Sequence, residues 1–85
     1  MKTASDQIDL HGLTLDEALP RLDEFLDAAF RAGYYRVWII HGKGSGVLRQ
    51  ETGHYLSGHP LVRGHRPADR YHGGIGATEV DLSDR

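Results

Sequence analysis

The apolar residues of this chain follow two different periods, and the changes between them divide the sequence into strands and helices. The segment QIDLHG, residues 7–12, alternates apolar and polar side chains, which is the two-residue period of a short strand that ends at Gly12. The run RVWII, residues 36–40, is apolar after its first residue and rich in branched side chains, which is typical of a strand buried on both faces. We expect these two strands to be neighbours in one sheet.

A helical period lies between the two strands. Thr14 followed by Glu17 forms a capping box, in which the two side chains satisfy backbone amides at the first turn of a helix. Apolar residues then recur at spacings of three and four up to a stop signal at Gly33, and acidic side chains occupy the opposite side. Pro20 falls inside this segment, where its missing donor costs roughly 3 kcal/mol in a standard interior, and it predicts a kink or a later start.

The second half of the chain shows the same kinds of signal more weakly. Residues 47–56 fit a helix interrupted by Gly53, and two further strands are expected at residues 61–66 and 77–82, separated by the glycine-rich HGGIG. The order β-α-β-α-β-β predicts a small two-layer α/β sandwich with a mixed, mainly parallel sheet. In this fold class the first strand, helix and strand form a right-handed parallel crossover.

Length and composition limit the chain to one small domain. Eighty-five residues can bury only one core, so we expect a single domain over residues 8–82, with loose ends at residues 1–7 and 83–85. Cysteine is absent, which excludes disulfides and thiolate metal sites. No apolar run approaches the roughly 18 residues that cross a bilayer, and no secretory signal is recognised, so the composition favours a cytoplasmic protein without a membrane partner.

Charge is distributed unevenly along the chain. The net charge of −2 argues against a protein that coats nucleic acid through its overall charge. Residues 41–72, however, hold five Lys and Arg against two Asp and Glu, together with five of the six histidines. We therefore expect a local cationic face on an acidic protein.

Polar side chains follow the first two strands at the point where each strand ends. Because the carboxyl ends of parallel strands meet at one edge of a sheet, Asp9 and His11 should lie beside His41. A buried carboxylate is costly without a partner, so Asp9 needs one. Taken alone, Asp9 fits a backbone cap as well as a catalytic role, and His11 fits a structural histidine better than a functional one. Their conjunction at one edge favours a site.

The turn HGKGSG, residues 41–46, joins the second strand to the second helix. Its three glycines let backbone amides approach a ligand, the following helix N-terminus adds a positive end, and Lys43 adds a full charge. Such a surface favours phosphate, although a purely structural turn fits these glycines about equally well. Because position 47 is valine, the spacing matches neither the nucleoside triphosphate nor the dinucleotide motif. Ser45 fits a helix cap better than a nucleophile.

Five segments, taken together, carry a resemblance to a known family. They are IDLHG, TLDEALPRLDEFLDAAFRAG, VWIIHGKGSGVLR, GHPLV and GGIGATEVDL, which together extend over residues 8–82. With their D-x-H-G and H-G-K-G-x-G motifs they resemble the Smr (small MutS-related) domain, and most closely the Smr domains at the C-terminus of bacterial MutS-like ATPases that lack mismatch recognition. The resemblance implies a fold similar to the C-terminal domain of translation initiation factor three, nucleic acid as the partner, and attachment to a larger MutS-like chain.

The first hypothesis is an endonuclease, because members of the family nick DNA or cleave RNA, and others act in recombination and repair control or in ribosome rescue. Asp9 would orient His11, His11 and His41 would serve as general base and acid, and Lys43 with the turn amides would stabilise the phosphorane. RNA supplies its own 2′-hydroxyl nucleophile. DNA would require water and therefore Mg²⁺ or Mn²⁺, for which one carboxylate beside histidines is a thin ligand set.

Two other hypotheses remain open. The domain could be a non-catalytic module that brings a larger ATPase to branched DNA or to ribosomes, or the turn could hold a small phosphate compound or nucleotide. No dedicated metal site and no certain cofactor is expected. The residues expected to bind nucleic acid or phosphate are Gly42, Lys43, Gly44, Ser45, Gly46, Arg49, Arg63 and Arg66, with Arg70 added for the non-catalytic module.

Overall fold

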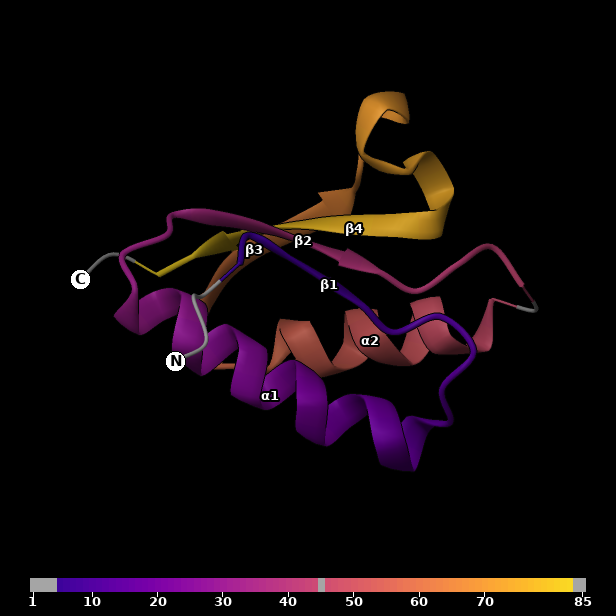
Figure 1. Ribbon diagram of the computed structural model, residues 1–85, viewed down its shortest axis with the longest axis horizontal. Coiled ribbons are helices and arrows are strands. Elements are labelled where there is room, and N and C mark those ends of the chain that lie inside the picture. The colour runs from indigo at the N-terminus through magenta and orange to yellow at the C-terminus, as the bar shows by residue number, and fades with distance from the viewer. Residues whose placement is uncertain (1–4, 45, 84–85) are drawn as a thin grey trace.

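The computed structural model describes residues 5–44 and 46–83 and contains a sheet with two helices packed on it (Figure 1). The strands are β1 (Gln7–Asp9), β2 (Arg36–Ile40), β3 (Val62–Pro67) and β4 (Ala77–Leu82). The helices are α1 (Leu15–Arg31) and α2 (Val47–Ser57). Two short 3-10 helices, η1 (Arg70–His72) and η2 (Gly74–Gly76), lie between β3 and β4.

The four strands form one mixed sheet in the order β1-β2-β4-β3. β1 is parallel to β2, whereas β4 is antiparallel to both β2 and β3. The predicted α/β class with a mixed, mainly parallel sheet is confirmed, since β1, β2 and β3 share one direction and β4 is reversed. β4 is reversed because the connection from β3 to β4, residues 68–76, is too short for the crossover of a dozen or more residues that parallel neighbours require.

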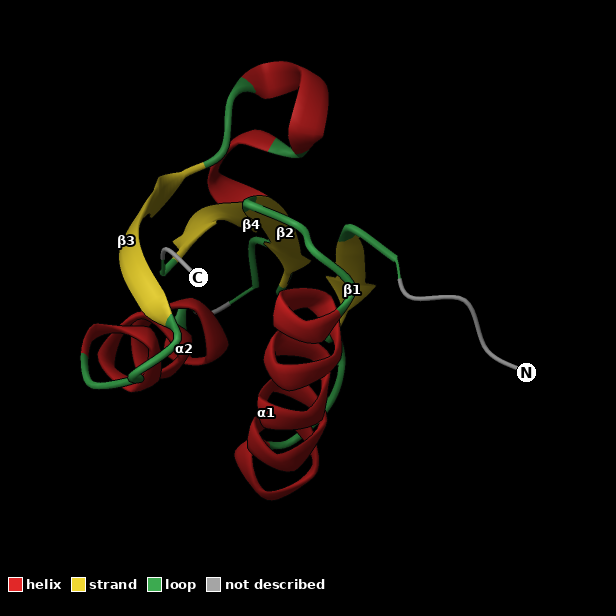
Figure 2. Ribbon diagram, turned by 90° about the vertical axis from the view of Figure 1, so that its left-hand side faces the viewer, coloured by secondary structure: helices red, strands yellow, loops and turns green. Residues whose placement is uncertain are grey.

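Both helices cover the same face of the sheet (Figure 2). Helix α1 buries Ala18, Leu22 and Leu26 along one side, and the sheet contributes Val37 and Ile39 to the same core. The spacing of the α1 residues is the helical period that the sequence predicts. The opposite face of the sheet carries no helix of comparable length within the described residues, and the segment with η1 and η2 projects from that face.

Helix α1 begins where the capping box places it. The backbone amide of Glu17 donates to the Thr14 hydroxyl at 3.3 Å, and the amide of Thr14 donates to the Glu17 carboxylate at 3.0 Å. Pro20 lies inside the helix, so the alternative of a later start is wrong. Pro20 is exposed, and so is Asp16, whose carbonyl loses its helical donor and can be hydrated instead. Helix α2 also runs through Gly53 without interruption.

Residues just outside the range 8–82 are hydrogen-bonded to the rest of the domain. The amide of Trp38 donates to the carbonyl of Asp6 at 2.8 Å, and the amide of Ser83 donates to the carbonyl of Leu61 at 2.8 Å. These bonds attach residues 6 and 83 to the sheet. Residues 1–4 and 84–85 lie outside the described residues.

Candidate functional site

β1 and β2 end side by side at one edge of the sheet (Figure 1). Asp9 is paired with Ile40, and the amide of Leu10 donates to the carbonyl of Ile40 at 2.6 Å. The two loops that follow the strands are also in contact, because a Cβ built on Gly42 would lie 3.3 Å from the Cβ of His11. The expected meeting of the two strand ends is therefore observed.

The carboxylate of Asp9 binds His11 twice. Its Oδ1 accepts from the backbone amide of His11 at 3.0 Å and lies 2.6 Å from the Nδ1 of the ring. A carboxylate only accepts, so Nδ1 carries a proton and Nε2 is the unprotonated nitrogen of the neutral ring. The His11 side chain is 69% exposed, and its hydrogen bond holds the pKa of Asp9 below the ordinary value. The structure thus presents an oriented imidazole to solvent.

His41 is buried and has partners on both ring nitrogens. Nδ1 lies 3.0 Å from the carbonyl of Gly42, and Nε2 lies 2.9 Å from the hydroxyl of Thr78, while only 4% of the residue is exposed. Since the carbonyl only accepts, Nδ1 donates to it, and the Thr78 hydroxyl donates to Nε2. Both ring nitrogens of His41 are therefore engaged inside the protein, and in this arrangement the ring has no nitrogen free to exchange a proton with a substrate. The ring joins the turn to β4.

The glycine turn is also held to the segment before β4. The amides of His41 and Gly42 both donate to the carbonyl of Gly76, at 3.0 and 2.9 Å. The Gly42 amide is therefore occupied and cannot bind a phosphate as expected. Gly42 has a φ of 83°, and its missing side chain permits the contact with His11. The exposed Lys43 runs over Gly76, because a Cβ built there would lie 3.3 Å from the Cγ of Lys43.

On its other side the turn borders a pocket of about 150 Å³, which we call the turn pocket. Helix α2 begins at this pocket, with Gly46 as an N-cap that forms no side-chain hydrogen bond and with no acidic residue in the first turn. The positive end of the helix is therefore not neutralised by a carboxylate of its own first turn. The lining residues are Gly12, Leu13, His41, Gly42, Gly44, Gly46, Leu48 and Arg49. Ser45 lies outside the described residues.

Two cations flank the turn with their charge unmatched. Among the residues that the structure describes, neither Lys43 nor Arg49 forms an ion pair. The guanidinium of Arg49 bends back toward the turn, since its Nη2 would lie 3.5 Å from a Cβ built on Gly46. Arg49 is therefore placed to meet an anion in the turn pocket.

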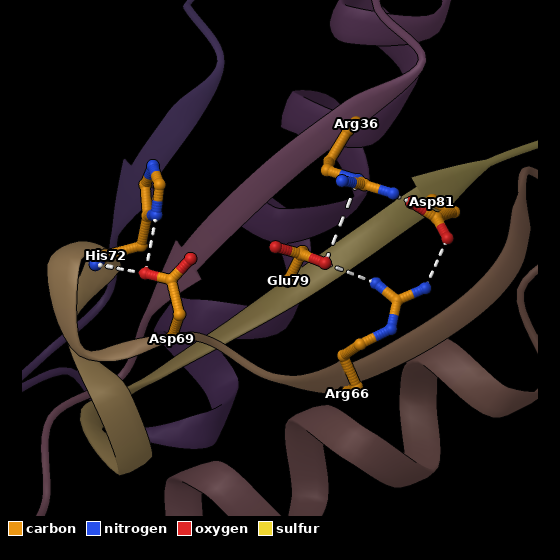
Figure 3. Close-up of polar contacts among 6 residues, drawn as sticks. All are labelled: Arg36, Arg66, Asp69, His72, Glu79 and Asp81. Carbon is orange, nitrogen blue, oxygen red and sulfur yellow. Dashed lines mark hydrogen bonds and ion pairs between the residues drawn. The ribbon is translucent and has the colours of Figure 1, made fainter.

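Arg66 has a different environment, on the face of the sheet away from the helices. It contacts the carboxylates of Glu79 and Asp81, and the Nε of Arg36 lies 2.8 Å from Asp81 (Figure 3). The hydrogen bonds with Arg66, and then with Arg36, hold the pKa of Asp81 below its ordinary value. The charge of Arg66 is matched by two carboxylates, so a phosphate would compete with Glu79 and Asp81 for its guanidinium. The cause is strand register, because Arg66 pairs with Glu79 and Arg36 with Asp81.

The two remaining cations lie away from the turn pocket. Arg63 is an exposed residue of the strand β3, at the register shift between Val62 and Gly64, and it is not part of the pocket lining. Arg70 is exposed in η1. Of the arginines expected to bind nucleic acid, the structure brings Arg49 alone to the pocket.

The face of the sheet opposite α1 and α2 carries a stacked pair that the sequence did not reveal. The rings of Trp38 and His72 are 4.3 Å apart between centroids and inclined by 8°. The Nδ1 of His72 lies 2.9 Å from the carboxylate of Asp69, and this hydrogen bond lowers the pKa of Asp69 (Figure 3). A lone tryptophan and an Asp-x-x-His spacing are the available sequence signals, but neither indicates that η1 folds over β2.

Two other features, a metal site and a membrane-spanning helix, are absent from the described residues. In this part of the chain, no three His, Asp or Glu side chains are grouped so that they could hold a metal ion. A search of the same residues for a helix long and apolar enough to cross a membrane finds none.

Comparison with known sequences identifies the family. A family model described as "Smr domain" matches residues 8–83. The curated relatives include the Endonuclease MutS2 of Pelotomaculum thermopropionicum, 46% identical over 79 residues, and that of Thermomicrobium roseum, 49% identical over 76 residues. These alignments cover 93% and 89% of this chain but 10% of each relative. The chain therefore spans about a tenth of the length of the curated relatives it matches.

Solved structures agree with the family model. The Smr domain of Thermus thermophilus MutS2 superposes with a TM-score of 0.89 at 36% identity, covering 94% of this chain and 100% of that one. YdaL, a stand-alone small MutS-related protein from Escherichia coli, superposes with a TM-score of 0.88 at 27% identity, covering 93% and 65%. The resemblance noted in the sequence is confirmed, and the chain belongs to the Smr domain family.

Proposed function

We propose that this domain binds nucleic acid and cleaves phosphodiester bonds at the edge where β1 and β2 end. The observation that carries the proposal is an exposed imidazole, oriented by a carboxylate, directly beside a pocket that favours an anion. The contact between Gly42 and His11 joins the two features, and Gly12 continues the same loop into the lining of the turn pocket. The curated relatives named Endonuclease MutS2 support a nuclease of this kind.

His11 is the group placed to move a proton. With Nδ1–H donated to Asp9, its Nε2 accepts the proton of the attacking hydroxyl, the new O–P bond forms, and the bond from phosphorus to the leaving oxygen breaks. The leaving oxygen is protonated by water, because His41 is buried. Arg49 and the N-terminus of α2 stabilise the negative charge that accumulates on the phosphate oxygens.

This inventory of groups favours RNA as the substrate. The 2′-hydroxyl of RNA is an internal nucleophile that one general base can activate. A DNA strand must be attacked by water, which usually requires Mg²⁺ or Mn²⁺, and the carboxylate of Asp9 is already engaged with His11. We therefore expect cleavage of RNA without added metal and weaker, metal-dependent nicking of DNA.

The test is a cleavage assay on labelled single-stranded RNA, plasmid DNA and branched DNA, with and without EDTA. His11→Gln should reduce RNA cleavage by about 10²- to 10⁴-fold, the usual contribution of a general base. The matched control is His54→Gln, which makes the same change on an exposed residue of α2 outside the turn pocket. Undiminished cutting by His11→Gln would show that a contaminating nuclease is responsible.

The burial of His41 favours a second candidate, a non-catalytic module that binds DNA or ribosomes. One accessible imidazole remains where two proton transfers must be assisted, whereas binding needs only the cations and the turn pocket. Salt-dependent binding that survives His11→Gln, with no cleavage of any substrate, would favour this candidate. Binding of mononucleotides in place of strands would favour the third hypothesis, a site for small phosphate compounds.

The cellular setting remains part of the proposal. We propose that the domain acts in the cytoplasm as part of a larger MutS-like chain, in the control of recombination and repair or in ribosome rescue. The support is its length relative to its curated relatives, of which it spans a tenth. Mass measurement of the protein isolated from its natural source would show whether further domains are attached.

A further inference from the structure

A second pocket, of about 260 Å³, shares a lining residue with the turn pocket. Among the described residues that residue is Arg49, whose side chain therefore borders both pockets. We call the second one the side pocket. It lies between α2 and the β3–β4 connection, and its walls include Gly53, Pro67, Ile75 and Ala77.

The side pocket is small and presents mainly apolar surface, although His65, Arg66 and Thr78 also line it. Pro67, Ile75 and Ala77 give it an apolar wall, and Ile75 remains 56% exposed although it is a large aliphatic residue. Gly53 keeps the opposite wall open, since a Cβ built there would first meet His65 at 3.8 Å. Its volume is below the roughly 300 Å³ at which pockets for drug-sized ligands begin, which suits a single ring system.

We propose that the side pocket holds one unstacked base of the nucleic-acid strand whose phosphate occupies the turn pocket. This inference rests on the proposed function and adds the class of substrate. A base and its own phosphate are joined through one sugar, so they can occupy two pockets that share a wall. Arg49 lines both pockets, and its cation would contact the phosphate in the turn pocket. A free inorganic anion would leave the apolar side pocket unused.

The proposal selects among nucleic acids. A base in an intact duplex is stacked on both faces and paired at its edge, so it can enter a pocket only after it has been unstacked and unpaired. Single strands, loops and the unpaired positions of branched molecules offer such bases without that cost. The substrate class is therefore a strand with unpaired nucleotides at the site of binding.

The test compares binding of one labelled oligonucleotide as a single strand and as a blunt duplex, by fluorescence anisotropy with the full chain. Gly53→Leu fills the side pocket, and Ile75→Ala removes part of its wall. The matched control for Gly53→Leu is Gly58→Leu, which makes the same change at the C-terminal end of α2, where an added Cβ would have no neighbour within 4 Å. The matched control for Ile75→Ala is Tyr35→Ala, which removes another exposed side chain, directly before β2.

Both pocket variants should weaken single-strand binding by about fivefold or more and leave duplex binding unchanged, because base contacts of this kind are lost one base at a time. The controls should stay within about twofold of the parent. If Gly53→Leu does not fold, the exposed Ile75 still provides the comparison.

Equal weakening of both forms, or unchanged binding in both pocket variants, would overturn the base pocket and leave the proposed function standing. If the parent binds no strand at all, the proposed function and the base pocket both fail. The converse experiment uses a set of oligonucleotides, each with one abasic position at a different place along the strand. The affinity should fall by the same factor when the missing base is the one that enters the pocket.

Discussion

Removing the hydroxyl that contacts His41 distinguishes a structural histidine from one that moves protons. Thr78→Val keeps the shape of the side chain but leaves the buried Nε2 of His41 without its donor. An unsatisfied buried acceptor costs about 1–3 kcal/mol. His41→Ala removes two hydrogen bonds and leaves a cavity, which together cost about 3–5 kcal/mol. A domain of 85 residues has a total stability of roughly 4–13 kcal/mol, so Thr78→Val is the variant that should stay folded.

Urea unfolding followed by the fluorescence of the single tryptophan measures the first effect, and RNA cleavage at the same pH measures the second. We expect Thr78→Val to lower the free energy of unfolding by about 1–3 kcal/mol while its cleavage rate stays within about threefold of the parent. The opposite result, unchanged stability with cleavage reduced a hundredfold or more, would refute the structural reading and return His41 to the reaction.

Three other substitutions or conditions give separate tests. Gly42→Ala should reduce cleavage for two reasons, the backbone strain at a φ of 83° and the 3.3 Å contact with His11. Gly12→Ala, with a φ of 79° and no neighbour within 4 Å, should show only the strain of about 1–2 kcal/mol. Urea unfolding measures the strain, and the cleavage assay measures the effect of the contact. Gly53→Ala should raise the free energy of unfolding by about 0.5–1 kcal/mol in urea, because it lies inside α2 at a φ open to alanine. The lowered pKa of Asp81 means that its ion pairs contribute fully above about pH 4 and that this contribution is lost as the pH falls through the folded value; a melting temperature unchanged between pH 5 and pH 2 would contradict this.

Strand and helix positions were predictable because their signals are local. The capping box of Thr14 and Glu17 marks the start of α1, and the run RVWII coincides with β2. Strand order was not predictable in the same way, because β4 lies between β2 and β3 and pairs with residues far away in the sequence. The direction of β4 could have been inferred from the short connection of residues 68–76, which cannot hold a parallel crossover.

The site was predictable where it depends on strand ends and not where it depends on register. The meeting of the loops after β1 and β2 follows from one parallel pair. The burial of His41 depends on Thr78, which lies 37 residues later. The charge of Arg66 is matched by Glu79 and Asp81, which lie across the sheet. A histidine and an arginine have the same letters whether they face solvent or a partner, so their availability becomes visible only once the strands are paired.

The start of the glycine turn is held in place by the same contacts that occupy polar groups of His41 and Gly42. The carbonyl of Gly76 holds two successive amides of the turn, and the ring of His41 ties it to β4 through Thr78. His41 and Gly42 are already fixed by these bonds, so little binding energy is lost in fixing these two residues when a phosphate arrives. The remaining attraction must then come from Arg49, Lys43 and the start of α2. Arg49 and Lys43 should therefore each contribute to the salt dependence of binding, whereas His41 should contribute nothing to it.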